Sequence, residues 1–323
     1  DRHESLHTKF EFSDNNFYQI IEPNVSAKIQ LEEVQFLNDE VIKTSISDFV
    51  KPFDLSVAPL MRIKAVVAKS GKSMIILDIH HIVADGISIR IIFDELLSLY
   101  KGCELNETRQ YKDYSEWLSM RDFSNQREYW TNEFADGIPV LELQLDYTRP
   151  QMQQFDGADL TIKLDSSVRE KIIAASRKFN VTESMLFMTA LLILLERESL
   201  QNDIVIGMPV AARMHKDTEH MVGVFINTLA IKFNIKETDK IKDLLERVNK
   251  KCIHAYENQE YPIELLLDDL KVIRDVSRNP LYDVLFNFKE FDDKGLYSGT
   301  DVEMVDMSET TKDAIRYIIL SDA

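Results

Sequence analysis

The residues best suited to chemistry are two adjacent histidines, His80 and His81, which are followed after three apolar residues by Asp85 and Gly86. The near-continuous apolar run 74–79 precedes them and predicts a buried strand that delivers both imidazoles to a tight turn. Because neighbouring residues of an extended strand point to opposite faces, one ring can enter a cavity while the other packs into the structure. This arrangement suits one acid–base or proton-carrying group near neutral pH.

The histidines are followed by a predicted helix. Apolar residues recur at helical spacing from Ile89 to Tyr100, and Gly102 supplies the stop. The start of that helix offers free N–H groups and a positive end that can face a developing oxyanion. Two histidines by themselves also fit a pair of hydrogen-bonded core residues. A zinc pair is a poorer alternative, because adjacent strand residues diverge and no third ligand is evident.

The elements around this run predict a mixed class. Residues 61–67 alternate between apolar and polar, and together with 74–79 and the turn residues 69–72 they predict a hairpin. A polar stretch with aromatics ends near 146–150 and is the best candidate for a crossover between lobes. Strands and helices mix throughout the chain, which predicts an α/β or α+β fold.

Two helix starts beyond the crossover can be predicted. Thr182 can cap an almost wholly apolar helix through Leu195, which must therefore be buried. Thr238 can cap a helix with an apolar face that runs from Ile241 to Cys252. Between them, residues 204–207 predict a short buried strand.

Three aromatic residues could be mistaken for a ligand platform. Trp117, Tyr129 and Trp130 lie beside acidic residues at helical spacing. Aromatics in such positions are more often part of a core, so we predict that they pack between the lobe sheet and the crossover.

Composition excludes several classes of function. The 323 residues contain 38 Lys+Arg and 55 Asp+Glu, a net charge of −17, which argues against a nucleic-acid partner. Two cysteines cannot make a disulfide framework, which favours a reducing, cytoplasmic setting. No apolar run is long enough to span a bilayer, so no membrane partner is expected. The chain opens at Asp1 without an initiator Met, which indicates part of a longer protein.

Nucleotide and metal chemistry also lose support. Gly71-Lys72-Ser73 resembles the tail of a phosphate-binding loop, but Val66 stands where the first glycine should be and a strand follows. A dinucleotide fingerprint, a nucleophile elbow and a zincin helix are all missing from the sequence. We therefore expect no metal and no bound cofactor.

The histidine run and five further segments resemble, in order, the core motifs of the condensation domains of nonribosomal peptide synthetases, which share the chloramphenicol-acetyltransferase-like fold. His7 departs from the second motif, where arginine is usual. The six segments are 2–10, 80–88, 111–117, 222–228, 258–264 and 274–281.

The resemblance implies a two-lobed, V-shaped α/β fold in which each lobe is a mixed sheet with flanking helices. Residues 1–147 would form the N-terminal lobe with the histidine run and residues 148–323 the C-terminal lobe, both truncated at their outer ends. It also implies amide-bond formation between a donor thioester and the amino group of an acceptor thioester, in antibiotic biosynthesis or other secondary metabolism. Both substrates would be tethered to phosphopantetheine on donor and acceptor carrier domains, with an adenylation domain adjacent.

The resemblance also implies roles for individual residues. His81 would be the catalytic histidine, His80 would hold the turn beside it, and the Gly86 amide would lie near the oxyanion. Three residues are candidates for lining the substrate tunnel: Ser88, Asn227 and Asn279.

A buried ion pair is predicted behind the histidines. Asp85 sits at a helix start where solvent should be scarce, so its carboxylate needs a charged partner. Arg213 follows a buried strand just before the fifth motif, and arginine offers a fork that matches two oxygens. Arg2 and Arg278 are rival partners.

Related domains remain as alternatives. Intact His80, His81 and Gly86 argue against a heterocyclization domain, and the fifth motif resembles condensation more than epimerization. An epimerization domain, a terminal acyltransferase and a noncatalytic docking platform of the same fold stay open. Ile87, where many relatives with L-configured donors carry tryptophan, favours a D-configured donor.

Overall fold

The computed structural model describes residues 2–154, 157–158, 160–273 and 275–288, together with the backbone of two C-terminal strands, 302–306 and 314–322. Arg274 of the seventh motif lies outside the described residues.

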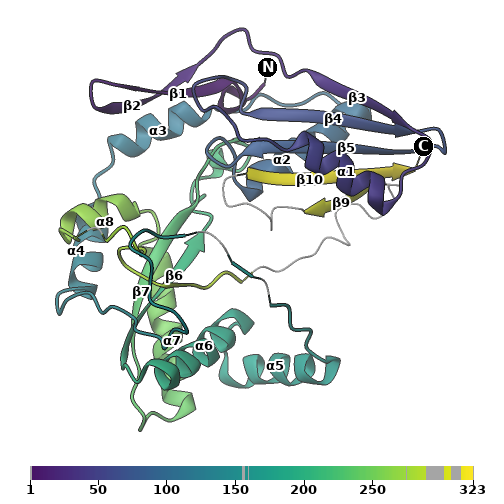
Figure 1. The fold of residues 1–323 in the computed structure, drawn as a ribbon. Coiled ribbons are helices and arrows are strands. Elements are labelled where there is room, and N and C mark those ends of the chain that lie inside the picture. Colours follow the sequence, from purple (N-terminus) through teal and green to yellow (C-terminus); the bar gives the residue numbers. More distant parts are fainter. Residues whose placement is uncertain are drawn as a thin grey trace. The chain divides into compact units, whose positions relative to one another are not determined.

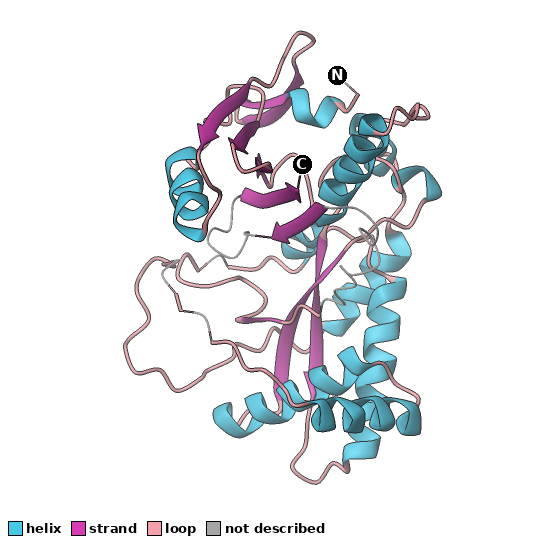
Figure 2. Ribbon diagram, turned by 90° about the vertical axis from the view of Figure 1, so that its right-hand side faces the viewer, coloured by secondary structure: helices cyan, strands magenta, loops and turns pink. Residues whose placement is uncertain are grey.

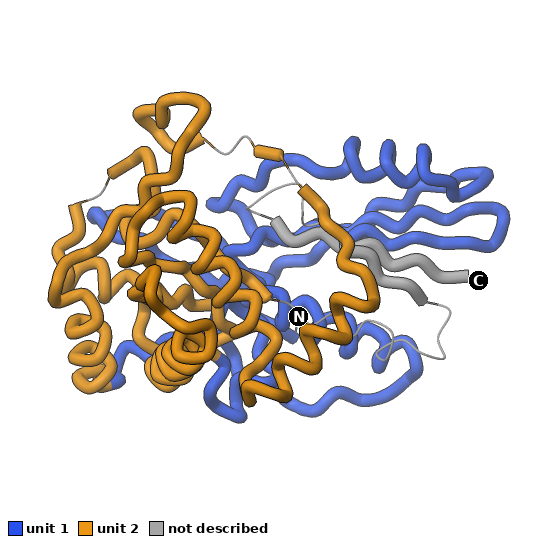
Figure 3. Tube along the Cα trace, turned by 90° about the horizontal axis from the view of Figure 1, so that it is seen from below, with its two compact units in different colours: residues 1–121, 213–225, 290–323 blue, residues 122–212, 226–289 orange. Residues whose placement is uncertain are grey.

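The chain forms two compact units, shown in different colours in Figure 3. Unit 1 contains residues 1–121, the segment 213–225 and the C-terminal strands, and unit 2 contains 122–212 and 226–289. The boundary therefore differs from the predicted division at 147/148. The reason is packing, since Trp130 and Phe134 join the hydrophobic core of unit 2.

Unit 1 is built on a five-stranded sheet in the order β3-β4-β5-β10-β9 (Figure 1). Only the pair β3 and β4 is parallel, and the other neighbours are antiparallel. The predicted hairpin is confirmed as β4 and β5, joined at Gly71 with φ of +93°. The strands are β3 (Ile29–Val34), β4 (Met61–Ala68), β5 (Lys72–His80), β9 (Val302–Asp306) and β10 (Ala314–Asp322).

Both faces of β5 are buried, which explains its near-continuous apolar sequence. Leu77 and Ile79 pack in one cluster with Ile89 and Phe93 of α2 (Gly86–Tyr100). The alternate residues Met74 and Ile76 pack in another cluster with Phe49 of α1 (Asp39–Phe49). The side-chain period of two therefore splits one strand between two helices. The remaining elements of unit 1 are η1 (Glu4–His7), the hairpin of β1 (Thr8–Ser13) and β2 (Asn16–Ile21), α3 (Tyr111–Ser119) and η2 (Lys216–Thr218).

Unit 2 has a three-stranded sheet in the order β7-β6-β8, and helices lie along its two long strands (Figure 2). The strand β6 (Asp203–Val210) is central, antiparallel to β7 (Asn227–Asn234) and parallel to β8 (Val284–Leu285). The helices are α4 (Ser124–Glu133), α5 (Ser166–Phe179), α6 (Glu183–Ser199), α7 (Ile241–Glu257) and α8 (Ile263–Asp269).

The two predicted helix starts have different outcomes. Thr182 caps α6 through a hydrogen bond from Met185 N at 3.2 Å, as predicted, although Leu194 of that helix is exposed. The expected cap at Thr238 is wrong, because α7 begins at Ile241 after Lys240 without a side-chain cap. The buried face of α7 begins at Leu244, one turn later than predicted.

The aromatic prediction holds for Trp130 and fails for Trp117. Trp130 is 2% exposed and donates its indole N–H to Asn258 O at 3.0 Å. Trp117 is 38% exposed and contacts His215 edge-on, with ring centroids 4.4 Å apart. The short helix α3 has no fully buried residue, so the helical spacing of Trp117 does not place its side chain in a core.

In the described part of the chain, no single helix is long and apolar enough to cross a membrane. The helices α5 and α6, which are bent by 100° relative to each other, meet that requirement only when they are counted together.

Candidate active site

The two histidines occupy different backbone environments. His80 is the last residue of β5, its N–H donates to Leu60 O at 3.0 Å, and its carbonyl accepts from Val83 N at 3.2 Å. That second bond closes a four-residue turn, 80–83, in which His81 is the second residue. The strand alternation expected for the two rings therefore applies only to His80, and the turn sets the position of His81.

The His80 ring is held locally. Its Nδ1 accepts a hydrogen bond from Ile82 N at 3.1 Å, so a neutral ring carries its proton on Nε2. Phe53 meets the ring edge-on with centroids 5.8 Å apart. These contacts give His80 a structural position in the turn.

The His81 ring is half-buried, and within the described residues it makes no hydrogen bond or ion pair. Neither ring nitrogen is therefore bound by a residue in the described ranges. Gly86 begins α2 nearby and is exposed, and the first N–H groups of a helix have no partner inside the helix.

Asp85 caps α2 from a fully buried position. Its side chain is 1% exposed, and Oδ1 accepts from both Ser88 N and Ser88 Oγ at 2.7 Å. Its Oδ2 accepts from Phe225 N at 3.1 Å. A carboxylate with this many donors and no access to solvent is not placed to act as a base.

The predicted ion pair is confirmed. Arg213 Nη2 lies 3.0 Å from Asp85 Oδ1 and 3.2 Å from Oδ2, and the two side chains are 6% and 1% exposed. Arg213 Nη1 donates to Met221 O at 2.8 Å and also to Thr218 O. Burial lowers the pKa of Arg213 from its ordinary value, and the Asp85 carboxylate opposes that shift.

The rival arginines bind other carboxylates. Arg2 Nε donates to Glu95 Oε1 at 2.9 Å, and Arg278 Nη2 lies 3.0 Å from Asp283 in unit 2. The pairing with Arg213 thus depends on the segment 213–225, which returns to unit 1.

This returning segment, which we call the strap (residues 213–225), is fastened to α2. Ser88 Oγ accepts from Gly223 N at 3.0 Å and from Arg213 Nη2 at 2.9 Å, and it lies 2.7 Å from Gly223 O. Asp85 N donates to Gly223 O at 3.3 Å. The guanidinium carbon of Arg213 lies 3.9 Å from the centroid of the Phe225 ring.

Tyr111 of α3 locks the same strap. A Cβ at Gly223 would lie 2.1 Å from Tyr111 Cδ2, so only glycine fits beneath the ring. The Tyr111 hydroxyl donates to Val224 O at 2.7 Å, and Ser5 Oγ donates to Val222 O at 2.6 Å. Burial raises the pKa of Tyr111 to about 12, so it remains a donor. Motifs from four parts of the sequence therefore converge behind the histidine turn.

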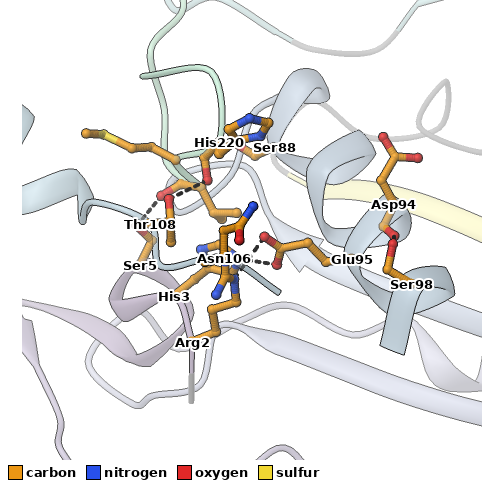
Figure 4. A network of polar contacts seen from close by, with 12 residues as sticks. Arg2, His3, Ser5, Ser88, Asp94, Glu95, Ser98, Asn106, Thr108 and His220 are labelled. Atoms are coloured by element: carbon orange, nitrogen blue, oxygen red, sulfur yellow. Dashed lines mark hydrogen bonds and ion pairs between the residues drawn. The ribbon is translucent and has the colours of Figure 1, made fainter. Parts of the chain in front are cut away.

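A second polar cluster ties the N-terminal segment to α2 (Figure 4). The Glu95 carboxylate faces Arg2 and His3, with His3 Nε2 2.6 Å from Oε2. His3 is 6% exposed, and burial lowers its pKa although Glu95 opposes the shift. Thr108 Oγ1 donates to His220 O of the strap at 2.9 Å.

The three tunnel candidates have other tasks in this structure. Ser88 is 0% exposed and belongs to the Asp85 network, which corrects its assignment to a tunnel wall. Asn227 Nδ2 donates to Gln259 O and Tyr261 O, while its Oδ1 accepts from Thr228 N and Ile263 N. Asn279 Oδ1 accepts from Leu281 N at 3.1 Å. These amides fasten backbone turns in unit 2.

Tyr111, Ser88 and Gly223 belong to one network that was not predicted from the sequence. An Asp at a helix start with Ser three residues later is the only local signal, because it is typical of an N-terminal cap. Among the described residues, no group of three His, Cys, Asp or Glu could hold a metal ion.

The chain belongs to the condensation-domain family, whose model matches residues 1–319. Condensation domains of nonribosomal peptide synthetases catalyse amide-bond formation, and their α/β, chloramphenicol-acetyltransferase-like fold is the one seen here.

Its relatives are much longer synthetases. The chain is 39% identical over 292 residues to surfactin synthase subunit 1 of Bacillus subtilis (strain 168), which covers 89% of the chain and 8% of the synthetase. It is 38% identical over 294 residues to gramicidin S synthase 2 of Aneurinibacillus migulanus, with 90% and 6% covered. The chain thus spans less than a tenth of the length of these two relatives.

Solved structures show the same fold at low identity. The four-domain nonribosomal peptide synthetase holo-AB3403 has a TM-score of 0.81 at 20% identity, with 99% of this chain and 27% of that chain covered. The X-domain from teicoplanin biosynthesis has a TM-score of 0.81 at 18% identity, with 99% and 79% covered.

Proposed function

We propose that this chain joins two carrier-bound substrates by an amide bond at His81. The amino nitrogen of the acceptor attacks the donor thioester carbonyl, the new C–N bond forms, and the C–S bond breaks. The donor carrier leaves as a thiol after taking the proton that the amine gives up. The observation that carries this proposal is a half-buried imidazole that has no partner among the described residues, on a turn in which Ile82 N donates a hydrogen bond to His80 Nδ1.

His81 is proposed to orient the amine and carry its proton during this transfer. An imidazole can do both near neutral pH. His80 is committed to the turn through Nδ1, and Asp85 is committed to Arg213, so neither competes for this role. The start of α2 at Gly86 is proposed to stabilise the oxyanion of the tetrahedral intermediate through its free N–H groups.

The partners follow from the chemistry of the proposed reaction. Both substrates arrive on phosphopantetheine arms of a donor and an acceptor carrier domain, so the arm is part of each substrate. An adjacent adenylation domain would load the acceptor. We propose that this assembly works in the cytoplasm, where Cys103 and Cys252, which form no disulfide, would stay reduced.

The test is a condensation assay with purified donor and acceptor carriers loaded with defined aminoacyl groups. Product on the acceptor carrier is measured by mass spectrometry of the intact carrier. Each donor is supplied in its L and D form, because Ile87 favours a D-configured donor. Product with at least one donor that disappears in His81→Ala supports the proposal, and no product from a folded chain with any loaded pair would contradict it.

A noncatalytic docking platform is the second candidate. A structure of the teicoplanin X-domain in complex with OxyB, with a TM-score of 0.77 to this chain, favours it. The same assay separates the two functions, because a docking platform forms no product. A pull-down with the loaded carriers would then show whether the chain still binds a protein partner.

A further inference from the structure

One cavity of unit 2, whose lining includes no residue of the histidine turn, has no place in the proposed reaction. It has a volume of about 570 Å³. Its lining residues come from the C-terminal end of α4 and the loop after it, from the C-terminal half of β7 and from α7, together with Asp203. This volume falls in the range of small-molecule sites, roughly 300–1,000 Å³.

Three basic side chains from two elements line this cavity: Lys232 of β7 and Arg247 and Lys251 of α7. Three carboxylates line it as well: Glu133, which pairs with Lys251, Asp203, whose Oδ1 accepts a hydrogen bond from Asn234 Nδ2, and Asp136. Lys232 Nζ donates to Gly137 O at 3.1 Å and forms no ion pair with a described residue. Two of its three N–H groups are therefore available. Lys251 is paired with Glu133, which leaves it further donors as well.

Arg247 contributes the most specific feature. One of its terminal nitrogens binds Asp239, but its buried Nε has no hydrogen-bond partner among the described residues. A buried N–H without an acceptor is unfavourable, and an oxyanion is the acceptor that a guanidinium prefers. Apolar residues, including Phe233, Leu244 and Val248, are also among those that line the cavity.

We propose that this cavity binds a small molecule through a phosphate or pyrophosphate group, with Lys232 and Arg247 as the principal ligands. A phosphate has more terminal oxygens than a carboxylate, which suits donors that come from separate elements. The volume leaves room for an organic group attached to the phosphate. The net charge of −17 opposes unspecific attraction of anions, so anion binding here requires a built site.

The site is tested by isothermal titration calorimetry of the chain with sodium pyrophosphate, ATP and coenzyme A, without divalent metal. We expect one saturable site per chain and a rise in melting temperature with ligand concentration. Tighter binding of ATP or of coenzyme A than of pyrophosphate would assign the site to a nucleotide or a pantetheine phosphate. Equal binding would assign it to the free anion.

The variants Lys232→Gln and Arg247→Gln should each weaken binding roughly tenfold or more, since each removes a charged hydrogen-bond donor. Lys250→Gln is the matched control, because Lys250 is an exposed neighbour on α7 outside the cavity lining, and it should bind like the parent. Circular dichroism checks each fold, and Lys232, which is half-exposed, provides the second variant if Arg247→Gln does not fold. The absence of saturable binding to all three probes, or parental affinity in folded Lys232→Gln, would overturn the proposal.

Discussion

At the scale of single residues, neighbouring side chains divide the work between chemistry and support. His80 and Asp85 have defined protein partners, whereas His81 has none in the described part of the chain. His80 and Asp85, which already have hydrogen-bond or ion-pair partners, fix the geometry of the turn. His81, which has no such partner among the described residues, is the group proposed to bind a substrate.

His81→Ala should reduce product formation roughly 10²- to 10⁴-fold, because that is the usual contribution of a positioned acid–base group. The fold should be unchanged, since the ring forms no hydrogen bond or ion pair with any residue that the structure describes. Single-turnover rates with loaded carriers measure the effect. Near-normal turnover by folded His81→Ala would reduce the histidine to a minor positioning group.

Asp85→Ala should cost about 3–5 kcal/mol in the free energy of unfolding, because it leaves the buried Arg213 guanidinium unpaired. Urea denaturation measures this loss. Asp94→Ala on the same helix is the control, since its ion pair with Arg90 is exposed and 3.9 Å long, and it should cost less than about 0.5 kcal/mol. Equal stability of the two variants would show that the buried pair contributes little.

At the scale of elements, the strap and the N-terminal segment both depend on α2. Side chains of α2, α3 and the N-terminal segment form hydrogen bonds with backbone N–H and carbonyl groups of the strap. These hydrogen bonds act together, so a substitution that removes one of them should disturb the strap and the histidine turn.

Gly223→Ala should destabilise unit 1 by roughly 1–3 kcal/mol, because the added methyl group overlaps the Tyr111 ring. The double variant with Tyr111→Ala should lose less than the sum of the two single variants, which a double-mutant cycle by thermal denaturation measures. Gly86→Ala is a stability control, since a Cβ there meets nothing within 4 Å. Strictly additive effects would show that the two residues do not interact.

The burial of His3 predicts a dependence of stability on pH. Burial lowers the pKa of His3, so its neutral form is favoured in the folded state and the unfolded chain takes up the proton first. This contribution is present above the unfolded pKa of about 6.5 and is lost as the pH falls through the lower folded value. In His3→Gln, the decline in melting temperature over that window should become shallower, and an unchanged slope would assign it to other groups.

At the scale of the whole molecule, charge selects the partners. A net charge of −17 over 323 residues repels the phosphate backbone of nucleic acids. An electrophoretic shift assay at low salt should therefore show no binding of duplex DNA or single-stranded RNA, although low salt is the condition that favours it. A shift that vanishes on adding salt would reveal a local basic surface that the total charge conceals.

The amino-acid sequence by itself determined the class of fold, the hairpin before the histidines, the cap at Thr182 and the pairing of Asp85 with Arg213. The fold class, the hairpin and the cap follow from local periodicity and capping chemistry within short stretches. The need of a buried charge for a partner predicts an ion pair at Asp85, and the choice of Arg213 rests on its place just before the fifth of the segments that resemble the family's motifs. Only the tertiary structure decided which aromatic is buried, where the units divide and what Ser88 and Asn227 bind. Those outcomes depend on which distant segment packs against each residue. The strap, for example, places Gly223 against the Tyr111 ring and buries Ser88. No periodicity along the chain predicts these contacts, because they join residues that are more than a hundred positions apart in the sequence.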